Sequence, residues 1–194
     1  MVKGNKNKII QGDCLVAMKD IPDKSVDMVL VDPPYLEGFE SIFEETKRII
    51  KDNGQILWFV QPIEIFNLPE KPKQLLIWQE PMSPKPIYHK YCEFYDIIAW
   101  YAYGVYTFNK ILWNLMGSIF NDVVVAEKRL HKWEKPLTLM EKLILVHTKV
   151  GDTVLDPFAG SGTTGVACKN LNRNYILIEK EPKYIEIIKK RLTP

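Results

Sequence analysis

The chain has 194 residues, of which 46% are hydrophobic and 26% are charged, and its 26 Lys and Arg residues against 24 Asp and Glu residues give a net charge of +2. This composition is typical of a globular protein, and the length predicts a single domain over residues 1–194 with one sizeable core. The nearly balanced charge neither requires nor excludes a polyanionic partner.

The sequence carries no pattern that indicates secretion, a membrane span or a metal centre. The first residues lack the apolar core of a signal peptide, and no apolar run approaches the roughly 20 residues of a membrane span. The three cysteines, at positions 14, 92 and 168, form neither a disulfide framework nor a CxxC motif. We therefore expect a cytoplasmic protein with free thiols, no metal and no membrane partner.

The first sixty residues alternate between strand and helix patterns. A short strand is expected at Ile9–Ile10, and the apolar run Val26–Val31 predicts a strand buried on both faces of a parallel sheet. Hydrophobic residues recur at helical spacing from Phe39 to Ile50, and Asp52-Asn53-Gly54 predicts the end of that helix. A second buried strand is expected at Gln55–Val60, so this part of the chain has the order of an α/β protein.

The middle of the chain has a different pattern. Repeated prolines from Pro62 to Pro86 predict irregular structure around one short strand at Leu75–Trp78. The aromatic run Phe94–Tyr103 predicts a strand that pairs antiparallel with it. No element is assigned to residues 104–130.

The α/β order returns near the end of the chain. Helices are expected around Leu139–His147, from the glycine-rich turn to Lys169, and over Pro182–Leu192, with strands at Thr153–Leu155 and Tyr175–Ile178. The sequence thus predicts an α/β fold with a mostly parallel sheet and an antiparallel hairpin.

A glycine-rich turn, Asp156–Gly165, follows a predicted strand and opens a predicted helix. Glycines there let a ligand approach the backbone, and Glu179 ends the next strand, where it can bind both ribose hydroxyls of a nucleoside. Gly160–Gly165 also matches the GxGxxG pattern of dinucleotide-binding proteins, which is weak alone. Fewer than about 30 residues follow it, so the rest of the sheet must come from the N-terminal half. We expect a nucleoside-binding sheet in which the chain begins part-way through the usual strand order, with Asp13 and Asp32 at carboxyl ends of strands.

The turn Asp32-Pro33-Pro34-Tyr35, with the Asp156 turn far downstream, resembles the amino-methyltransferases of nucleic acids in their β-type order, in which the catalytic motif precedes the cofactor motif. The similarity extends over Gln11–Tyr35 and His131–Leu192, about half of the chain. It implies a circularly permuted Rossmann-like methyltransferase fold and S-adenosylmethionine as the cofactor.

The chemistry of methyl transfer explains the residue types in the catalytic turn. An aromatic exocyclic amine is a poor nucleophile because its lone pair is delocalised into the ring. The Asp32 carboxylate and the Pro33 carbonyl can each accept an N–H bond from the amine and favour a pyramidal nitrogen. Pro33 and Pro34 hold the turn rigid, and Tyr35 is expected to stack on a base flipped out of the duplex. The alternative is that Asp32 only caps a turn.

The resemblance also implies the cofactor contacts. Asp156 and the backbone of Phe158–Gly162 hold the methionine portion, Glu179 the ribose and Asp13 the adenine. Lys135 resembles a residue near the methionine carboxylate, and the alternative is a salt-bridged surface lysine before a helix. The complete set is Asp13, Cys14, Lys135, Asp156, Phe158, Ala159, Gly160, Ser161, Gly162, Thr163 and Glu179.

The segment that recognises the target is short. Between the two motifs only residues 104–130, about 27 positions, are available for a recognition element. So short an insert predicts loose recognition, recognition shared across a homodimer, or a very short site. Basic and aromatic residues are interleaved there, as nucleic-acid contacts require, although a buried aromatic set with solvated lysines would give the same pattern. The candidates are Lys110, Lys128, Arg129 and Lys132, with Trp113 and Phe120.

Together these features predict a site-specific DNA methyltransferase of a restriction-modification system that methylates N6 of a flipped adenine. Cytosine N4 is the nearest alternative, because the position that receives the methyl group is chemically similar. The family more often has Ser in place of Asp32 in cytosine enzymes, so Asp32 favours adenine. An RNA adenine methyltransferase is another alternative. A silent nucleic-acid-binding subunit is disfavoured by the intact catalytic turn and glycine-rich turn.

Overall fold

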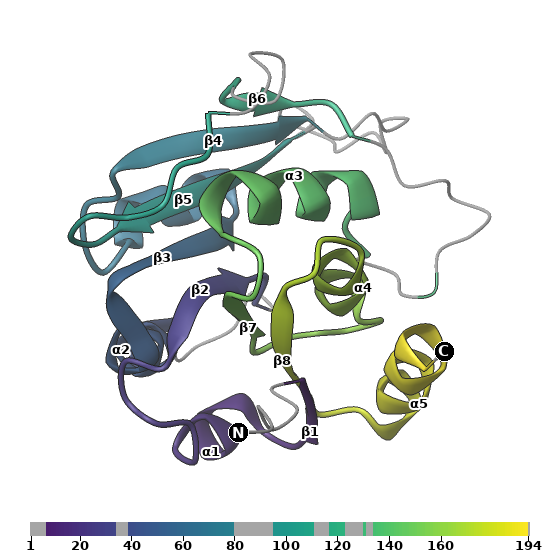
Figure 1. Ribbon diagram of the computed structural model, residues 1–194. Helices are drawn as coiled ribbons and strands as arrows, with labels where there is room; N and C mark the ends of the chain where they lie inside the picture. Colours follow the sequence, from purple (N-terminus) through teal and green to yellow (C-terminus); the bar gives the residue numbers. More distant parts are fainter. Residues whose placement is uncertain are drawn as a thin grey trace, which may run out of the picture.

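The computed structural model describes residues 7–33, 39–79, 95–110, 117–122, 130 and 134–193. Within these ranges an eight-stranded sheet forms the centre of the molecule, with helices on both faces (Figure 1). The strands are β1 (Lys8–Gln11), β2 (Val26–Val31), β3 (Ile50–Val60), β4 (Gln74–Gln79), β5 (Tyr95–Ala102), β6 (Ile119–Phe120), β7 (Thr153–Asp156) and β8 (Asn174–Glu179). The helices are α1 (Cys14–Met18), α2 (Phe39–Ile49), α3 (Leu137–His147), α4 (Thr163–Asn170) and α5 (Pro182–Leu192), with a 3-10 helix, η1, at Pro62–Asn67.

The strand order across the sheet is β1-β8-β7-β2-β3-β5-β4-β6. The first five strands in this order are parallel. β5 is antiparallel to both β3 and β4, and β6 runs parallel to β4 at the edge. The predicted α/β fold, with a mostly parallel sheet and an antiparallel β4–β5 pair, is confirmed. The last strands in the sequence, β7 and β8, lie between β1 and β2, so the sheet is entered part-way round as expected.

The start of β3 differs from the prediction. The strand begins at Ile50, directly after α2, whereas a helix end at Asp52-Asn53-Gly54 and a strand from Gln55 were expected. The register against β2 shifts here, because Val26 pairs with Ile50 but Met28 pairs with Gln55. The extra residues form an irregularity that leaves polar side chains exposed while the strand continues.

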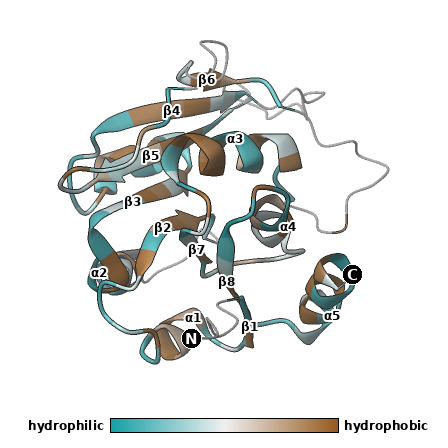
Figure 2. Ribbon diagram, viewed as in Figure 1, coloured by the Kyte–Doolittle hydropathy of each residue, from teal (hydrophilic) through white to brown (hydrophobic). Residues whose placement is uncertain are grey.

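The sheet separates two layers of hydrophobic packing. Met28 and Leu30 of β2 belong to a cluster with α3, α4 and α5, whereas Val29 and Val31 belong to a second cluster with α1 and α2. Hydrophobic residues accordingly dominate the central strands in Figure 2. Burial on both faces explains why the run Val26–Val31 has almost no polar residue.

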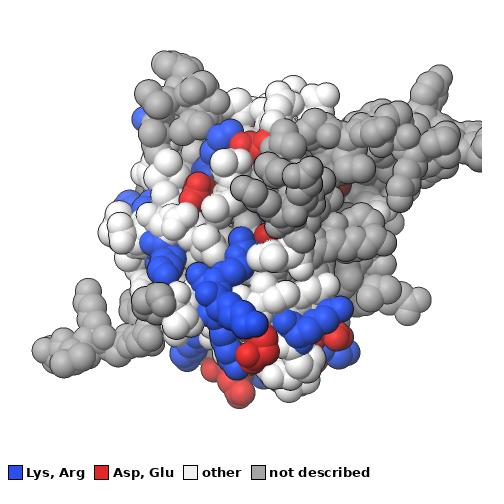
Figure 3. All heavy atoms as spheres, turned by 90° about the vertical axis from the view of Figure 1, so that its right-hand side faces the viewer, with Lys and Arg blue, Asp and Glu red and all other residues white. Residues whose placement is uncertain are grey.

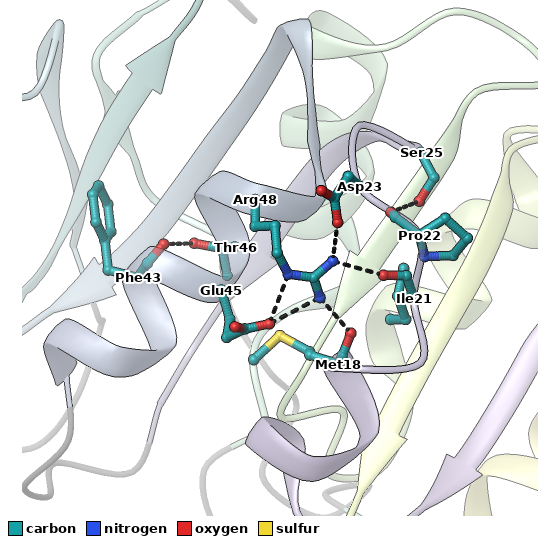
Figure 4. Close-up of polar contacts among 9 residues, drawn as sticks. All are labelled: Met18, Ile21, Pro22, Asp23, Ser25, Phe43, Glu45, Thr46 and Arg48. Carbon is teal, nitrogen blue, oxygen red and sulfur yellow. Dashed lines mark hydrogen bonds and ion pairs between the residues drawn. The ribbon is translucent and has the colours of Figure 1, made fainter.

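Arg48 of α2 fixes α1 beside the sheet (Figure 4). Its guanidinium donates to the carbonyl oxygens of Met18 and Ile21 at 2.8 and 3.0 Å, and it pairs with Glu45 and Asp23. The carbonyls at the C-terminal end of α1 are thereby satisfied by a side chain from another helix. This contact holds the short helix whose N-terminus follows β1.

Three short elements, α1, η1 and β6, were not predicted. The five residues of α1 are too few to give a helical hydrophobic pattern. In the described ranges, no helix is long and apolar enough to cross a membrane. Cys14 and Cys168 are buried free thiols, and Cys92 lies outside the described residues.

Candidate active site

Acidic residues follow or end four neighbouring strands of the sheet. Asp13 comes two residues after β1, Glu179 ends β8, Asp156 ends β7, and Asp32 follows β2 directly. Because these strands are parallel and adjacent, their carboxyl ends meet at one edge of the sheet. The sequence prediction that placed Asp13 and Asp32 at carboxyl ends of strands is confirmed. Pro33 is buried beside this edge, while Pro34 and Tyr35 lie outside the described residues.

The glycine-rich turn is held by backbone bonds to β8 and within itself. The Ala159 N–H donates to the Ile178 carbonyl at 2.9 Å, and the Gly162 N–H donates to the Ala159 carbonyl at 2.7 Å. Gly160 and Gly162 have φ values of +51° and +83°, which residues other than glycine rarely adopt. A Cβ at Gly162 would also lie 2.9 Å from Cγ1 of Ile188. The turn is therefore a fixed backbone surface at the end of β7.

The Glu179 carboxylate is oriented by two backbone donors. Its Oε2 accepts the Gly160 N–H at 2.8 Å, and its Oε1 accepts the Glu181 N–H at 2.8 Å. A carboxylate has about four acceptor positions, so these two bonds fix the group and leave capacity for two hydroxyl donors. This arrangement fits the predicted contact with a ribose.

Asp156 is buried beneath the glycine-rich turn. Its Oδ1 accepts the Phe158 N–H at 2.9 Å, and its Oδ2 accepts the Thr164 hydroxyl. The pKa of this carboxyl is raised to about 7, mainly by burial, while the two hydrogen bonds act to lower it and the charges of Asp32 and Glu179 add to the increase. These contacts show that Asp156 anchors the turn, and its contact with a methionine portion stays a prediction.

Asp13 caps the N-terminus of α1. Its Oδ1 accepts the N–H groups of Leu15 and Val16 at 3.0 and 3.3 Å. The neighbouring Gly12 N–H donates to the Glu179 carbonyl at 3.0 Å, which ties the Asp13 turn to β8. Cys14, the first residue of α1, is buried against the α1–α2 layer. The structure thus shows Asp13 as the cap of α1, and its contact with an adenine stays a prediction.

Lys135 lies beside the Asp32 turn. Its Nζ is 3.2 Å from Oδ1 of Asp32 and 2.9 Å from Oδ2 of Asp96, and its side chain is only 10% exposed. The ammonium also lies 5.0 and 5.3 Å from the ring centroids of Phe59 and Trp78. Lys135 is salt-bridged before a helix, as the alternative expected, but it is not a surface lysine, because its side chain is only 10% exposed. Its position near a methionine carboxylate stays a prediction. Sequence reasoning missed Asp96, whose signal is an acid within an otherwise uncharged aromatic run.

Glu134, also missed from the sequence, joins the glycine-rich turn to the segment that carries Lys135. Its Oε1 lies 2.8 Å from Nη1 of Arg191 and 3.1 Å from the Thr163 hydroxyl, and its Oε2 accepts the Leu130 N–H at 2.8 Å. Burial acts to raise the pKa of Glu134, but these donors together lower it below its ordinary value. Arg191 also donates to the Ser161 carbonyl, which makes this contact a brace between α5 and the turn.

The predicted recognition residues are only partly described. Lys110 is exposed, as a phosphate contact requires, whereas Phe120 is buried in β6 and packs in the core. For Phe120 the structure therefore agrees with the alternative, in which the aromatic residues of this segment are buried, and not with a contact to bases. Figure 3 shows Lys and Arg side chains gathered on the side of the molecule where α5 lies, and the last turn of α5 contains Lys189, Lys190 and Arg191. The other candidates lie outside the described residues: Lys128, Arg129, Lys132 and Trp113.

The strand order and the acidic edge define a nucleoside-binding α/β protein with a second polar turn beside the nucleoside site. Residues 113–190 match the family model of the DNA methylases that act on N6 or N4. The chain is 30% identical to the type II methyltransferase M.HinfI of Haemophilus influenzae, covering 96% of this chain and 68% of that protein. It is 28% identical to the type II methyltransferase M2.MboI of Moraxella bovis, covering 94% and 86%. The chain belongs to the N6/N4 family of DNA methylases.

Solved structures agree with this assignment. The M1.HpyAVI–SAM complex superposes with a TM-score of 0.82 at 32% identity, covering 96% of this chain and 99% of that one. The cytosine-N4-specific PvuII DNA methyltransferase superposes with a TM-score of 0.81 at 17% identity, covering 98% and 90%, which shows the shared fold alone. The predicted methyltransferase fold is confirmed.

Proposed function

We propose that this chain transfers the methyl group of S-adenosylmethionine to N6 of an adenine in DNA. The observation that carries the proposal is the position of Asp32 in the sheet. Its strand β2 pairs directly with β7, which leads into the glycine-rich turn, and β7 pairs with β8, which ends at Glu179. Only β7 separates the carboxyl ends of β2 and β8, so an amine held at Asp32 would lie on the same edge as a nucleoside held at Glu179, as methyl transfer between them requires.

The residues fit S-adenosylmethionine by the chemistry of their donors and acceptors. The oriented Glu179 carboxylate suits a ribose diol, the fixed backbone of Phe158–Gly162 can approach the methionine portion, and Asp13 lies at the adenine end. The bound cofactor supplies a methyl group on a positively charged sulfur. Asp32 and the Pro33 carbonyl accept N–H bonds from the target amine and orient its lone pair, so the protein contributes positioning more than covalent chemistry.

Asp at position 32 favours adenine over cytosine by the family pattern, and cytosine N4 is the second candidate because the family includes both activities. The test is direct. Unmethylated plasmid DNA is incubated with the protein and S-adenosylmethionine, digested to nucleosides and analysed by mass spectrometry. N6-methyldeoxyadenosine is expected. N4-methyldeoxycytidine would reassign the base, methylation of RNA alone would reassign the substrate, and cofactor binding without any transfer would indicate a silent subunit.

Recognition of the DNA is expected to depend on few direct contacts. The alignments with M.HinfI and M2.MboI extend over 246 and 238 residues, longer than this chain, so both relatives carry insertions relative to it. We assign the phosphate contacts to Lys110, Lys128, Arg129 and Lys132, and a second copy of the chain is a source of further contacts. A restriction-modification role would place the protein in the cytoplasm with its DNA.

Replacing Glu179 with alanine is expected to weaken S-adenosylmethionine binding. Loss of hydrogen bonds to a charged acceptor costs about 1.5–3 kcal/mol, roughly 10- to 100-fold in Kd by calorimetry. Glu181→Ala is the matched control, because Glu181 is exposed and its side chain makes no capping bond. Tight NAD binding without S-adenosylmethionine binding would overturn the cofactor assignment.

A further inference from the structure

A buried ammonium group lies between two carboxylates at the proposed catalytic turn. Lys135 Nζ is 2.9 Å from Oδ2 of Asp96 and 3.2 Å from Oδ1 of Asp32. Asp96 stands in β5, opposite Trp78 of β4, and β5 is antiparallel to β3. The N-terminal end of β5 therefore lies at the same edge as the carboxyl ends of the parallel strands. Asp96 reaches the catalytic edge from the antiparallel part of the sheet.

We propose that Asp96 is a positioning residue for methyl transfer, which acts by sharing Lys135 with Asp32. This inference rests on the proposed function of Asp32. The three groups carry a net charge of −1 in a site that is mostly buried, since the side chains of Asp96 and Asp32 are 21% and 25% exposed. The Lys135 ammonium holds the Asp32 carboxylate in one orientation. Because Asp96 shares the same ammonium, the charge of Asp32 is only partly neutralised.

Electrostatics explain why the second carboxylate matters. A charge pair gains more as the local dielectric constant falls, so an ammonium with one carboxylate in this site would pair closely with it. Asp32 would then be a weaker acceptor for the target amine. Asp96, at the shorter distance, draws Lys135 away from Asp32, so Asp32 keeps acceptor strength for the amine N–H.

The aromatic surroundings fix the path of Lys135. Its ammonium lies over the rings of Phe59 and Trp78, and Trp78 is itself held by a bond of 2.9 Å from its Nε1 to the Asp122 carbonyl. Lys135 therefore has a defined position set by β3, β4 and β5. Because Lys135 cannot move far, loss of Asp96 is expected to change the interaction between Lys135 and Asp32.

The kinetic test replaces Asp96 with asparagine. We expect kcat to fall about 10- to 100-fold while KM for S-adenosylmethionine and for DNA change less than about twofold. Asp27→Asn is the matched control, because Asp27 is 19% exposed and pairs with Lys51 at 2.6 Å at the opposite end of β2. It should leave kcat unchanged. An equal fall in both variants, or a loss confined to KM, would overturn the proposal.

A double-mutant comparison tests whether Asp96 acts through Lys135. In a Lys135→Met background, Asp96→Asn should change kcat less than about twofold, and Lys135→Arg should restore part of the activity lost in Lys135→Met. Independent, additive losses would mean that Asp96 does not act through Lys135.

Urea unfolding tests the sharing of Lys135 without any need for activity. Either Asp32→Asn or Asp96→Asn leaves one of the two carboxylates beside the ammonium, whereas the double variant removes both. The double variant should therefore lower the unfolding midpoint by more than the sum of the single variants. Additive shifts would overturn the shared arrangement. A wild-type protein that transfers no methyl group but shows this coupling would refute the proposed function while retaining the arrangement.

Discussion

Asp32→Ala is expected to reduce methyl transfer by at least about 100-fold while leaving the affinity for S-adenosylmethionine within about twofold. The reason is that the target amine and the cofactor are expected to contact different residues at the carboxyl edge of the sheet. Asp32 faces the proposed amine site after β2, whereas the predicted cofactor residues other than Lys135 belong to the turns after β1, β7 and β8. Removal of one acceptor at the amine should raise the barrier to transfer without removing a cofactor contact.

The structure indicates that this variant will fold. Asp96 still pairs with Lys135 at 2.9 Å after Asp32 is replaced, so the buried ammonium keeps a counter-charge. Transfer is measured with labelled S-adenosylmethionine at saturating DNA, and cofactor affinity by calorimetry. A comparable loss of cofactor affinity would make the turn a structural element. Undiminished transfer would remove Asp32 from the mechanism.

Much of the fold follows from patterns within short segments. Val26–Val31 is apolar because both of its faces are covered, and β4 and β5 were predicted because aromatic and β-branched residues mark strands. The predicted start of β3 at Gln55 was wrong, because Asp52-Asn53-Gly54 is a typical turn sequence and predicts the end of the preceding helix. The irregularity against β2 instead accommodates those residues inside a strand.

The candidate site was predictable to the level of strand ends. Asp13, Asp32, Asp156 and Glu179 each follow or end an apolar strand, and parallel pairing is enough to bring them to one edge. The partners of Lys135 were not predictable, since Asp32 and Asp96 are far from it in the sequence and meet it only through the order of β2, β3, β5 and β4. The N-terminal cap made by Asp13 could not be predicted either, because α1 is too short to give a helical hydrophobic pattern.

Two buried ionisable groups give the fold opposite responses to pH. Burial raises the pKa of Asp156 to about 7, and burial lowers the pKa of His147 to about 3. His147 Nδ1 lies 2.9 Å from Oε1 of Gln55, and its ring packs 4.9 Å from that of Trp100, which indicates a structural histidine. For His147, stability is fully present above its unfolded pKa of 6.5 and is lost as the pH falls toward 3.

For Asp156 the sign is reversed. A carboxyl with a raised folded pKa contributes stability that is fully present below its unfolded pKa of 3.8 and is lost as the pH rises through about 7. For each group, the difference between its folded and unfolded pKa corresponds to roughly 4 kcal/mol of stability. Between about pH 4 and 6.5 the two contributions have opposite slopes and largely cancel.

Asp156→Asn should expose this cancellation. Asparagine keeps an acceptor for the Phe158 N–H and a polar partner for Thr164, but it cannot ionise. The free energy of unfolding of the variant, relative to wild type, should rise by on the order of 4 kcal/mol between pH 4 and pH 8. The variant alone should lose stability on acidification below pH 6.5, because the His147 contribution is then no longer offset. Urea unfolding at half-unit pH intervals measures both curves, and parallel profiles would show that Asp156 is ionised throughout this range.

Since S-adenosylmethionine carries a positive sulfur and a positive amino group, its binding should favour the ionised carboxylate of Asp156. The affinity of the wild-type protein for S-adenosylmethionine should therefore increase from pH 6 to pH 8 more steeply than that of the Asp156→Asn variant.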